Sequence, residues 1–229
     1  MTNFPDYGAT FAHWRAGAAQ PWQAYTCHDF VTGLADGRLP QKAFLHYLVQ
    51  DYVFLVHFAR AWALAIVKST TLEEMKICAG MVEALANQEM SLHVSKCAAA
   101  GISEQTLFSA TEEVENLAYT RYVLDAGLSG DFLDLVAALA PCVFGYGEIG
   151  ARLTKITHAD TPYGDWIAAY GSAEYQDLCR SVGAMIDNAV LCRLGEDPVG
   201  AARWPHIQSR FTRATELEVG FWSMGLRGA

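Results

Sequence analysis

The sequence has few basic residues. Its 16 lysines and arginines stand against 25 aspartates and glutamates, which gives a formal net charge of -9 over 229 residues. The electric field of such a chain repels polyphosphates, and no cluster of basic residues supplies a local exception. We therefore expect no nucleic-acid partner.

The sequence also lacks the signals of membrane insertion. No cationic region followed by an apolar run stands near its start, and the most apolar stretches are interrupted by His57, Arg60 and Asp134. Both absences argue against a secretory leader and a membrane span. We expect a soluble, cytoplasmic protein with no membrane partner.

No pair of cysteines has the CxxC spacing of a zinc site. The six cysteines are Cys27, Cys78, Cys97, Cys142, Cys179 and Cys192. A reducing compartment keeps such cysteines as thiols, so neither zinc nor a disulfide scaffold is expected. Most free cysteines are small buried hydrophobic residues, and a functional one needs a local reason.

Apolar residues recur at spacings of three and four through nearly the whole chain, which is typical of long helices. No stretch has the alternating pattern of a strand. The predicted helices cover residues 8–18, 22–35, 41–68, 71–100, 112–128, 131–157, 163–170, 174–193 and 199–225. Residues 1–229 are therefore predicted to form a single all-α bundle around one core.

Two carboxylates fall on apolar faces of predicted helices. Helical spacing places Asp51 on one stripe with Tyr47 and Phe54, and Glu218 on one face with Phe221. Each acid has two interpretations: it pairs with a structural arginine or a backbone amide, or it faces a ligand. A buried acid without a cation has a raised pKa and can transfer protons near neutral pH.

Cys142 is singled out by its neighbours. Because Cys142 and Tyr146 are four residues apart on a helix, they point the same way and can share a pocket. Pro141 either begins a new helix or kinks a continuing one, and the unbroken apolar periodicity before it favours the kink. The nearby glycines at 145, 147 and 150 allow close approach of either a ligand or another helix.

Two further patterns are candidates for binding sites: a set of aromatic side chains and a pair of possible metal ligands. Tyr119 and the set Tyr163, Trp166 and Tyr170 offer flat surfaces with polar tips, which suit a heteroaromatic ligand as well as a core. Glu89 and His93 are four residues apart, a spacing compatible with metal ligation. No second Glu-x-x-His motif accompanies them, so a hydrogen bond between the two side chains is the simpler expectation.

Several segments of the sequence, in their order and spacing, match one known family. They are "DGRLP", "FLHYLVQDYVFLVHFARA", "EMSLH", "YTRYVLDAGLSGDFLDLVAALAPCVFGYGEIG", "YGDWIAAYG" and "GFWSMGLR". From about Phe11 to Arg227 the chain resembles the TenA/thiaminase II family, whose members share an all-α fold like that of haem oxygenase. The resemblance implies a single haem-oxygenase-like helical domain.

The resemblance also implies roles for individual residues. Cys142 corresponds to the nucleophile that adds to a pyrimidine ring, Asp51 to the acid that polarises the ring, and Glu218 to the acid that transfers protons to the leaving group. The positions that match the family's substrate-binding aromatics are Tyr119, Tyr146, Tyr170, Phe54 and Phe221. Phe54 is a departure, because some members carry tyrosine there.

The function implied by the resemblance is that of a hydrolase of thiamin salvage. Such an enzyme converts 4-amino-5-aminomethyl-2-methylpyrimidine into the hydroxymethyl compound, cleaves thiamin less efficiently, needs no metal or other cofactor, and assembles as a homotetramer. A thiol that adds to an aminopyrimidine needs a ring nitrogen that is hydrogen-bonded or protonated, and a neighbouring acid meets this need.

Two other functions stay open at this point. A metal-dependent oxygenase on the same scaffold would use Glu89 and His93. A pyrimidine-binding or regulatory protein without turnover is the other alternative, although the acidic charge balance argues against direct contact with DNA.

Overall fold

The computed structural model describes residues 4–157 and 161–228, which form twelve α-helices and one π-helical segment and contain no β-strand. The all-α prediction is therefore confirmed. The helices are α1 (Ala9–Gly17), α2 (Ala19–Thr26), α3 (Asp29–Ala35), α4 (Gln41–Lys68), α5 (Leu72–Ala84), η1 (Leu85–Glu89, the π-helix), α6 (Met90–Ala99), α7 (Glu104–Phe108), α8 (Val114–Ser129), α9 (Phe132–Ile156), α10 (Gly164–Gly171), α11 (Ala173–Leu194) and α12 (Trp204–Arg227).

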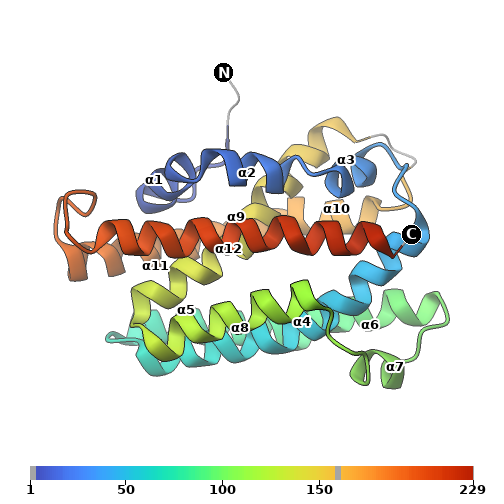
Figure 1. The fold of residues 1–229 in the computed structure, drawn as a ribbon, viewed down its shortest axis with the longest axis horizontal. Helices are drawn as coiled ribbons and strands as arrows, with labels where there is room; N and C mark the ends of the chain where they lie inside the picture. Colours follow the sequence, from blue (N-terminus) through green and yellow to red (C-terminus); the bar gives the residue numbers. More distant parts are fainter. Residues whose placement is uncertain (1–3, 158–160, 229) are drawn as a thin grey trace.

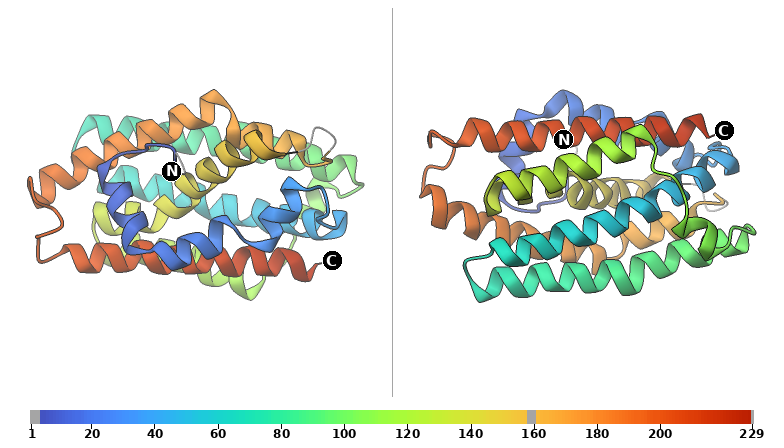
Figure 2. Two further views of the ribbon diagram at one scale, coloured as in Figure 1. Left: turned by 90° about the horizontal axis from the view of Figure 1, so that it is seen from above. Right: turned by 60° about the horizontal axis from the view of Figure 1, so that its bottom comes forward.

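The helices pack around α9. Figure 1 shows α12 crossing the molecule, with α1, α2 and α3 on one side and α4 and α8 on the other. Seen from above, α9 runs between α11 and α12, and it also packs against α10, α8, α4 and α2 (Figure 2). Residues on nearly every side of α9 are therefore in the core.

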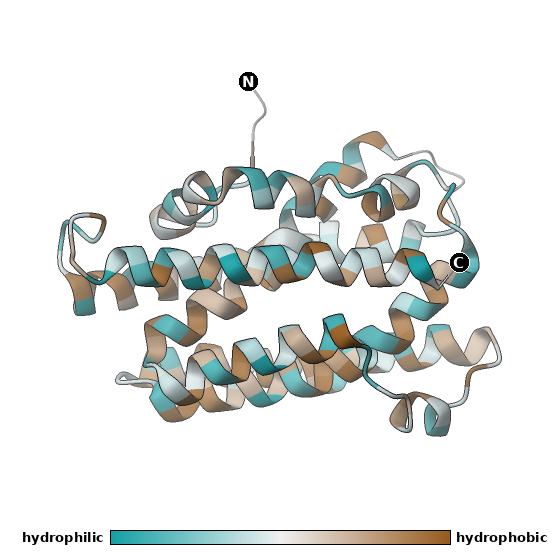
Figure 3. Ribbon diagram, viewed as in Figure 1, coloured by the Kyte–Doolittle hydropathy of each residue, from teal (hydrophilic) through white to brown (hydrophobic). Residues whose placement is uncertain are grey.

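The most apolar helix is this central one. By length and composition α9 is the one described helix that meets the criteria for a membrane span, yet its most apolar stretch lies entirely inside the bundle. That burial is what a core helix of a soluble protein shows. By contrast, α12 alternates between hydrophilic and hydrophobic segments along its length, as expected of a helix with one buried face (Figure 3).

Local signals set where the main helices begin and end. Asp131 caps α9, because its carboxylate accepts hydrogen bonds from the backbone N–H groups of Leu133 and Asp134, while the Asp134 carboxylate accepts one from the backbone N–H of Asp131. Ser172 caps α11, which ends at Gly195 with a positive φ of 86°. These caps fix where α9 and α11 start relative to each other, and both helices carry residues of the site.

The structure corrects the predicted helices at four places. The predicted helix 22–35 is two helices, α2 and α3, because the chain turns at Cys27 and His28. The predicted helix 71–100 is continuous but contains the π-helix η1, and the short α7 was not predicted. The last helix begins at Trp204, with Pro205 in its first turn, and not at residue 199.

Pro141 lies inside α9, so Cys142 is not at the start of a new helix. The alternative that a helix N-terminus lowers the pKa of this thiol is therefore wrong. The glycines that follow serve helix packing: a Cβ on Gly145 would lie 2.1 Å from the Tyr25 ring, and one on Gly150 would lie 2.3 Å from the backbone of Tyr170. Of the two interpretations, close approach of other helices is the one observed.

Candidate active site

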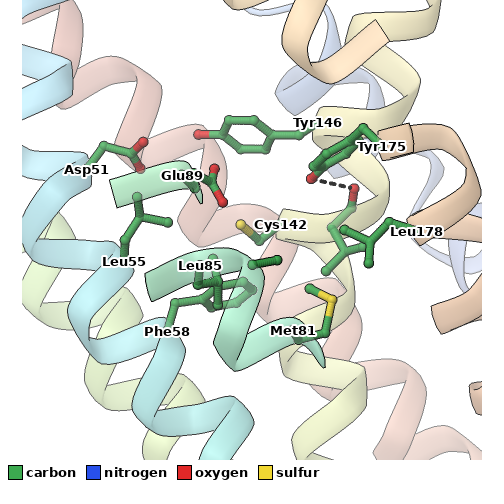
Figure 4. A pocket seen from close by; sticks show the side chains of 12 residues that line it. Asp51, Leu55, Phe58, Met81, Leu85, Glu89, Cys142, Tyr146, Tyr175 and Leu178 are labelled. Atoms are coloured by element: carbon green, nitrogen blue, oxygen red, sulfur yellow. Dashed lines mark hydrogen bonds between the residues drawn. The ribbon is translucent and has the colours of Figure 1, made fainter. Parts of the chain in front are cut away.

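A small enclosed cavity of about 30 Å³ lies where α4, α5, η1, α9 and α11 meet. Figure 4 shows the thiol of Cys142 at its centre, with side chains from the other helices around it. Its lining consists of Asp51, Leu55, Phe58, Met81, Ala84, Leu85, Glu89, Cys142, Val143, Tyr146, Tyr175 and Leu178. The lining is apolar except for two carboxyls, one thiol and two tyrosines, so the polar groups converge on a small volume.

The Cys142 thiol faces this cavity from the middle of α9 (Figure 4). Burial raises the pKa of the thiol well above its ordinary value, and the nearby carboxylates of Glu218, Glu89 and Asp51 raise it further. At neutral pH the free protein therefore holds a neutral thiol. A thiolate forms here only when another group is present to accept the proton.

Asp51 is buried on α4 and lines the same cavity. Its Oδ2 accepts a hydrogen bond from the Tyr47 hydroxyl at 2.9 Å and lies 2.6 Å from Nε2 of His93. Both polar contacts that the described residues make with this carboxyl use Oδ2, which leaves Oδ1 for a ligand. The alternative that Asp51 is held by a structural arginine is wrong.

His93 is the partner of Asp51 that the sequence did not reveal. Its Nδ1 lies 2.9 Å from the carbonyl oxygen of Glu89. Because a carbonyl only accepts hydrogen bonds, Nδ1 carries a proton. The short contact between Nε2 and Oδ2 of Asp51 needs a second proton, which lies between these two atoms. Burial lowers the pKa of His93, but the hydrogen bond and charge of Asp51 outweigh burial and raise it. The expected hydrogen bond between the Glu89 and His93 side chains is replaced by this backbone contact.

Glu218 is buried on α12, and its Oε1 accepts a hydrogen bond from the Tyr119 hydroxyl at 2.9 Å. Burial raises the pKa of this carboxyl to about 8, because the Tyr119 hydrogen bond offsets only part of the desolvation and the charge of Asp51 adds to it. Glu218 does not line the cavity. Among the carboxylates, however, its charge makes the largest contribution to the raised pKa of Cys142.

Glu89 is a third acid at the site. It ends the π-helix η1, lines the cavity, and its Oε1 accepts a hydrogen bond from Tyr170 at 2.6 Å. Burial raises the pKa of Glu89, although the charge of His93 opposes this. A π-helix widens the turn by one residue and is frequent at functional sites, and here it forms one wall of the cavity.

The predicted aromatic residues fall into two groups. Tyr146 lines the cavity, and its ring centroid lies 4.8 Å from that of Tyr170. Phe54 packs against Tyr119 and Phe221 with centroid distances of 5.0 and 5.4 Å. This second group does not line the cavity but surrounds Glu218, because Tyr119 is its hydrogen-bond partner.

The metal-type pair does not gather further ligands. Among the residues that the structure describes, no three His, Cys, Asp or Glu side chains are placed to hold one ion. Glu89 instead bonds to Tyr170, and His93 to Asp51. The i, i+4 spacing of Glu89 and His93 was the available sequence signal, but it gave no sign that the partner of His93 lies 42 residues earlier.

The chain is similar in sequence to proteins of one known family. A sequence model described as the TENA/THI-4/PQQC family matches residues 15–228. A protein of Halalkalibacterium halodurans named aminopyrimidine aminohydrolase is 35% identical over 209 residues, which cover 90% of this chain and 91% of that protein.

Solved structures show the same fold. A crystal structure described as a TenA family transcription regulator from a Silicibacter species superposes with a TM-score of 0.94 and 57% identity, covering 96% of this chain and 97% of that one. A Shewanella denitrificans domain described as having a heme oxygenase-like fold has a TM-score of 0.65 at 15% identity, covering 96% of each chain. The predicted haem-oxygenase-like bundle is therefore confirmed.

Proposed function

The chain belongs to the TENA/THI-4/PQQC family, and from this premise we propose that it is an aminopyrimidine aminohydrolase. The reaction consumes 4-amino-5-aminomethyl-2-methylpyrimidine and water and releases 4-amino-5-hydroxymethyl-2-methylpyrimidine and ammonia. The observation that carries the proposal is the position of one thiol at an enclosed cavity between buried acids that have no arginine or lysine partner in the described parts of the chain.

The first step is addition of Cys142 to the ring. The sulfur bonds to the unsubstituted ring carbon beside the carbon that carries the methylene. The displaced electron pair moves through the ring to the ring nitrogen beside the exocyclic amine. That nitrogen receives the proton of the thiol, and the resulting N–H donates a hydrogen bond to Oδ1 of Asp51. This order agrees with a thiol that is neutral until a ring is bound.

The second step is loss of the amine. The ring returns its electron pair, the bond between the methylene carbon and the amine breaks, and Glu218 donates its proton to the departing nitrogen. A carboxyl with a pKa of about 8 is protonated at neutral pH and is suited to this donation. Water then adds to the exposed methylene carbon, gives a proton back to Glu218, and expulsion of the thiol restores the ring.

We assign His93 as a positioning residue. It touches no substrate in this scheme, but together with Tyr47 it occupies Oδ2 of Asp51 and so orients Oδ1 toward the cavity. Tyr119 does the same for Glu218. Tyr146 and Tyr170 supply ring surfaces at the cavity and beside it, and Phe54 and Phe221 keep the surroundings of Glu218 dry.

The cavity must enlarge to admit the ring. A volume of about 30 Å³ has room for roughly one water molecule. The pyrimidine therefore enters only when a wall moves, and the π-helix η1 forms the wall that carries Leu85 and Glu89.

The experiment is ammonia release by the purified protein from the aminomethyl pyrimidine, with Cys142→Ser and Cys27→Ser compared in parallel. Cys27 is exposed and lies away from the cavity, so it controls for the loss of any thiol. We expect C142S to lose turnover by a factor of about 1,000 or more and C27S to keep it. Undiminished turnover in C142S would remove the proposed nucleophile.

We further place the reaction in thiamin salvage in the cytoplasm and propose a homotetramer as the assembly. The family match and the burial of α9 support a soluble enzyme of thiamin metabolism. Size-exclusion chromatography with light scattering tests the tetramer, since a monomeric mass at micromolar concentration would contradict it.

A further inference from the structure

A groove at the surface adjoins the enclosed cavity. It has a volume of about 360 Å³ and lies between η1 and the corner where α10 meets α11. Four residues line both spaces: Ala84, Glu89, Tyr175 and Leu178. The remaining lining of the groove is Ala169, Tyr170, Ser172 and Glu174.

The other surface hollows do not share this position. A depression of about 340 Å³ near Arg38, one of about 240 Å³ near Arg213 and a smaller one of about 50 Å³ beside His93 have no lining residue in common with the cavity. The groove beside Glu89 is the hollow that shares its lining with the cavity, so it is the most direct route from Cys142 to solvent.

The groove carries negative charge. Glu89 stands at its inner end and the exposed Glu174 at its rim, and no described residue that lines it is basic. Tyr170 and Tyr175 add two aromatic rings, with centroids 5.0 Å apart and planes at 86°. Carboxylates beside aromatic faces are the surroundings that favour an organic cation.

The substrate must extend in this direction. A ring that contacts Cys142 and Asp51 fills the enlarged cavity, and its leaving group is only one methylene away. A five-membered thiazolium ring with its side chain is larger than the enclosed space of about 30 Å³, whereas the groove holds it easily.

Building on the aminohydrolase function, we infer that this groove is the binding site of the leaving group and that it selects a positively charged one. A thiazolium carries a permanent charge and needs no proton in order to leave. It lies between Glu89 and Glu174 while the pyrimidine occupies the cavity, whereas a primary amine is small enough to stay beside the ring, where Glu218 protonates it. A formylated amine is neutral and gains nothing from these carboxylates.

The test is charge reversal at the rim, Glu174→Lys, assayed with three substrates: thiamin, the aminomethyl pyrimidine and its neutral N-formyl derivative. Glu174 touches the groove only, so the groups around Cys142 stay in place. We expect kcat/KM to fall about fivefold to tenfold for thiamin, chiefly through KM, and less than about twofold for the two amine substrates. The difference should shrink as salt is added, because the charge is exposed.

A matched control is Glu196→Lys, which changes the net charge equally. Glu196 is exposed just beyond the other end of the same helix, about 30 Å from Glu174 by the rise of α11. We expect no change with any substrate. Glu174→Gln, which keeps the side-chain shape, should show about half of the effect in logarithmic units.

The outcomes separate the two proposals. Equal losses for thiamin and for the two amine substrates, or no loss at all in E174K, would overturn the leaving-group site while the aminohydrolase function stands. If the wild-type protein turns over none of the three, the aminohydrolase function is wrong. Calorimetric titration of thiamin into wild type and E174K then tests whether the groove binds a cation. Equal affinities of the two proteins for thiamin would contradict a cation site there.

Discussion

The central helix α9 places buried acids in two contrasting environments. At its start, Asp134 is buried and Asp131 half-exposed, and Arg203 bonds to both. At its middle, Cys142 and Tyr146 face the cavity beside Asp51 and Glu89. No arginine or lysine among the described residues pairs with these two acids or with the buried Glu218 on α12. The helix is the same, but the partners differ.

The two regions hold their acids in different protonation states. Burial opposes ionisation of Asp131, but the hydrogen bond and charge of Arg203 outweigh it and lower its pKa to about 2. At Glu218 burial is the largest influence, only tyrosine hydroxyls oppose it, and the pKa rises to about 8. An arginine partner fixes an acid in its charged form for structure, whereas tyrosine partners leave it able to transfer a proton.

Other buried acids of the bundle follow the first pattern. Glu148 on α9 accepts hydrogen bonds from Arg15 and Trp22. Glu74 on α5 accepts two from Arg193; burial raises its pKa, but these bonds outweigh it and lower the pKa. The acids of the site therefore differ from the other buried acids because no arginine side chain pairs with them. This contrast leads to four predictions.

The largest expected effect is loss of turnover in Glu218→Gln. Glutamine keeps the shape and still accepts the Tyr119 hydrogen bond, but it has no proton to give to the leaving amine. We expect kcat to fall by about 100-fold to 1,000-fold. The matched control is Glu148→Gln, the same change at an arginine-paired acid, which should lower stability and leave kcat unchanged. Comparable turnover in both variants would contradict the proposal that Glu218 transfers a proton and Glu148 does not.

The next effect is loss of stability in Arg203→Met. This change leaves Asp134 buried without its closest guanidinium, and we expect the free energy of unfolding to fall by about 2 kcal/mol, less than for a fully buried pair because Arg203 is partly exposed. Denaturant unfolding measures it. Arg213→Met, on the helix that begins directly after Arg203, breaks only a surface pair with Glu216 and should change stability by less than about 0.5 kcal/mol. Any fall in kcat would link the ion-paired end to catalysis.

A smaller effect is expected for His93→Gln. Without His93, Asp51 keeps only the Tyr47 hydrogen bond and turns more freely, so kcat/KM should fall about tenfold. If His93 acts through Asp51, the double variant with Asp51→Asn should lose little beyond Asp51→Asn alone. Additive losses would mean that His93 has a merely structural role. His46→Gln, which alters a histidine paired with Glu113 on the same helix as Asp51, serves as the control.

The smallest effect is a pH-dependent change in melting temperature, of opposite sign in the two regions. The folded pKa of Glu218 lies above its ordinary value of 4.5, so its ionisation destabilises the fold increasingly as the pH rises from there to about 8. Glu218→Gln should therefore melt above wild type at pH 9 and equal it near pH 4.

Asp131 behaves in the reverse way. Its folded pKa of about 2 lies below the ordinary 3.8, so its stabilisation is present above pH 3.8 and is lost as the pH falls toward 2. Asp131→Asn should melt below wild type at pH 7, and the gap should narrow at pH 3. Parallel melting series from pH 3 to 9 test both signs, and shifts of the same direction in the two variants would contradict the contrast.

Much of the fold follows from local sequence patterns. The three-and-four spacing of apolar residues predicted long helices, and α4 occurs at the predicted residues 41–68. The apolar spacing did not predict two local interruptions of the helices. Nothing in the apolar spacing distinguishes the π-helix η1 from the α-helix around it, and the break at Cys27 separates two amphipathic stretches that share one periodicity.

The sequence by itself determined which chemical groups the interior contains: an acid on the apolar face of α4, another on α12, and a thiol four residues before a tyrosine on α9. Helical periodicity is a local property, so it can be read from neighbouring residues. Only the tertiary structure decided the partners, because whether an acid meets arginine, histidine or tyrosine depends on how helices distant in sequence pack. Those contacts set the pKa values of Glu218 and Asp131, and with them which acid can transfer a proton and which only holds the fold together.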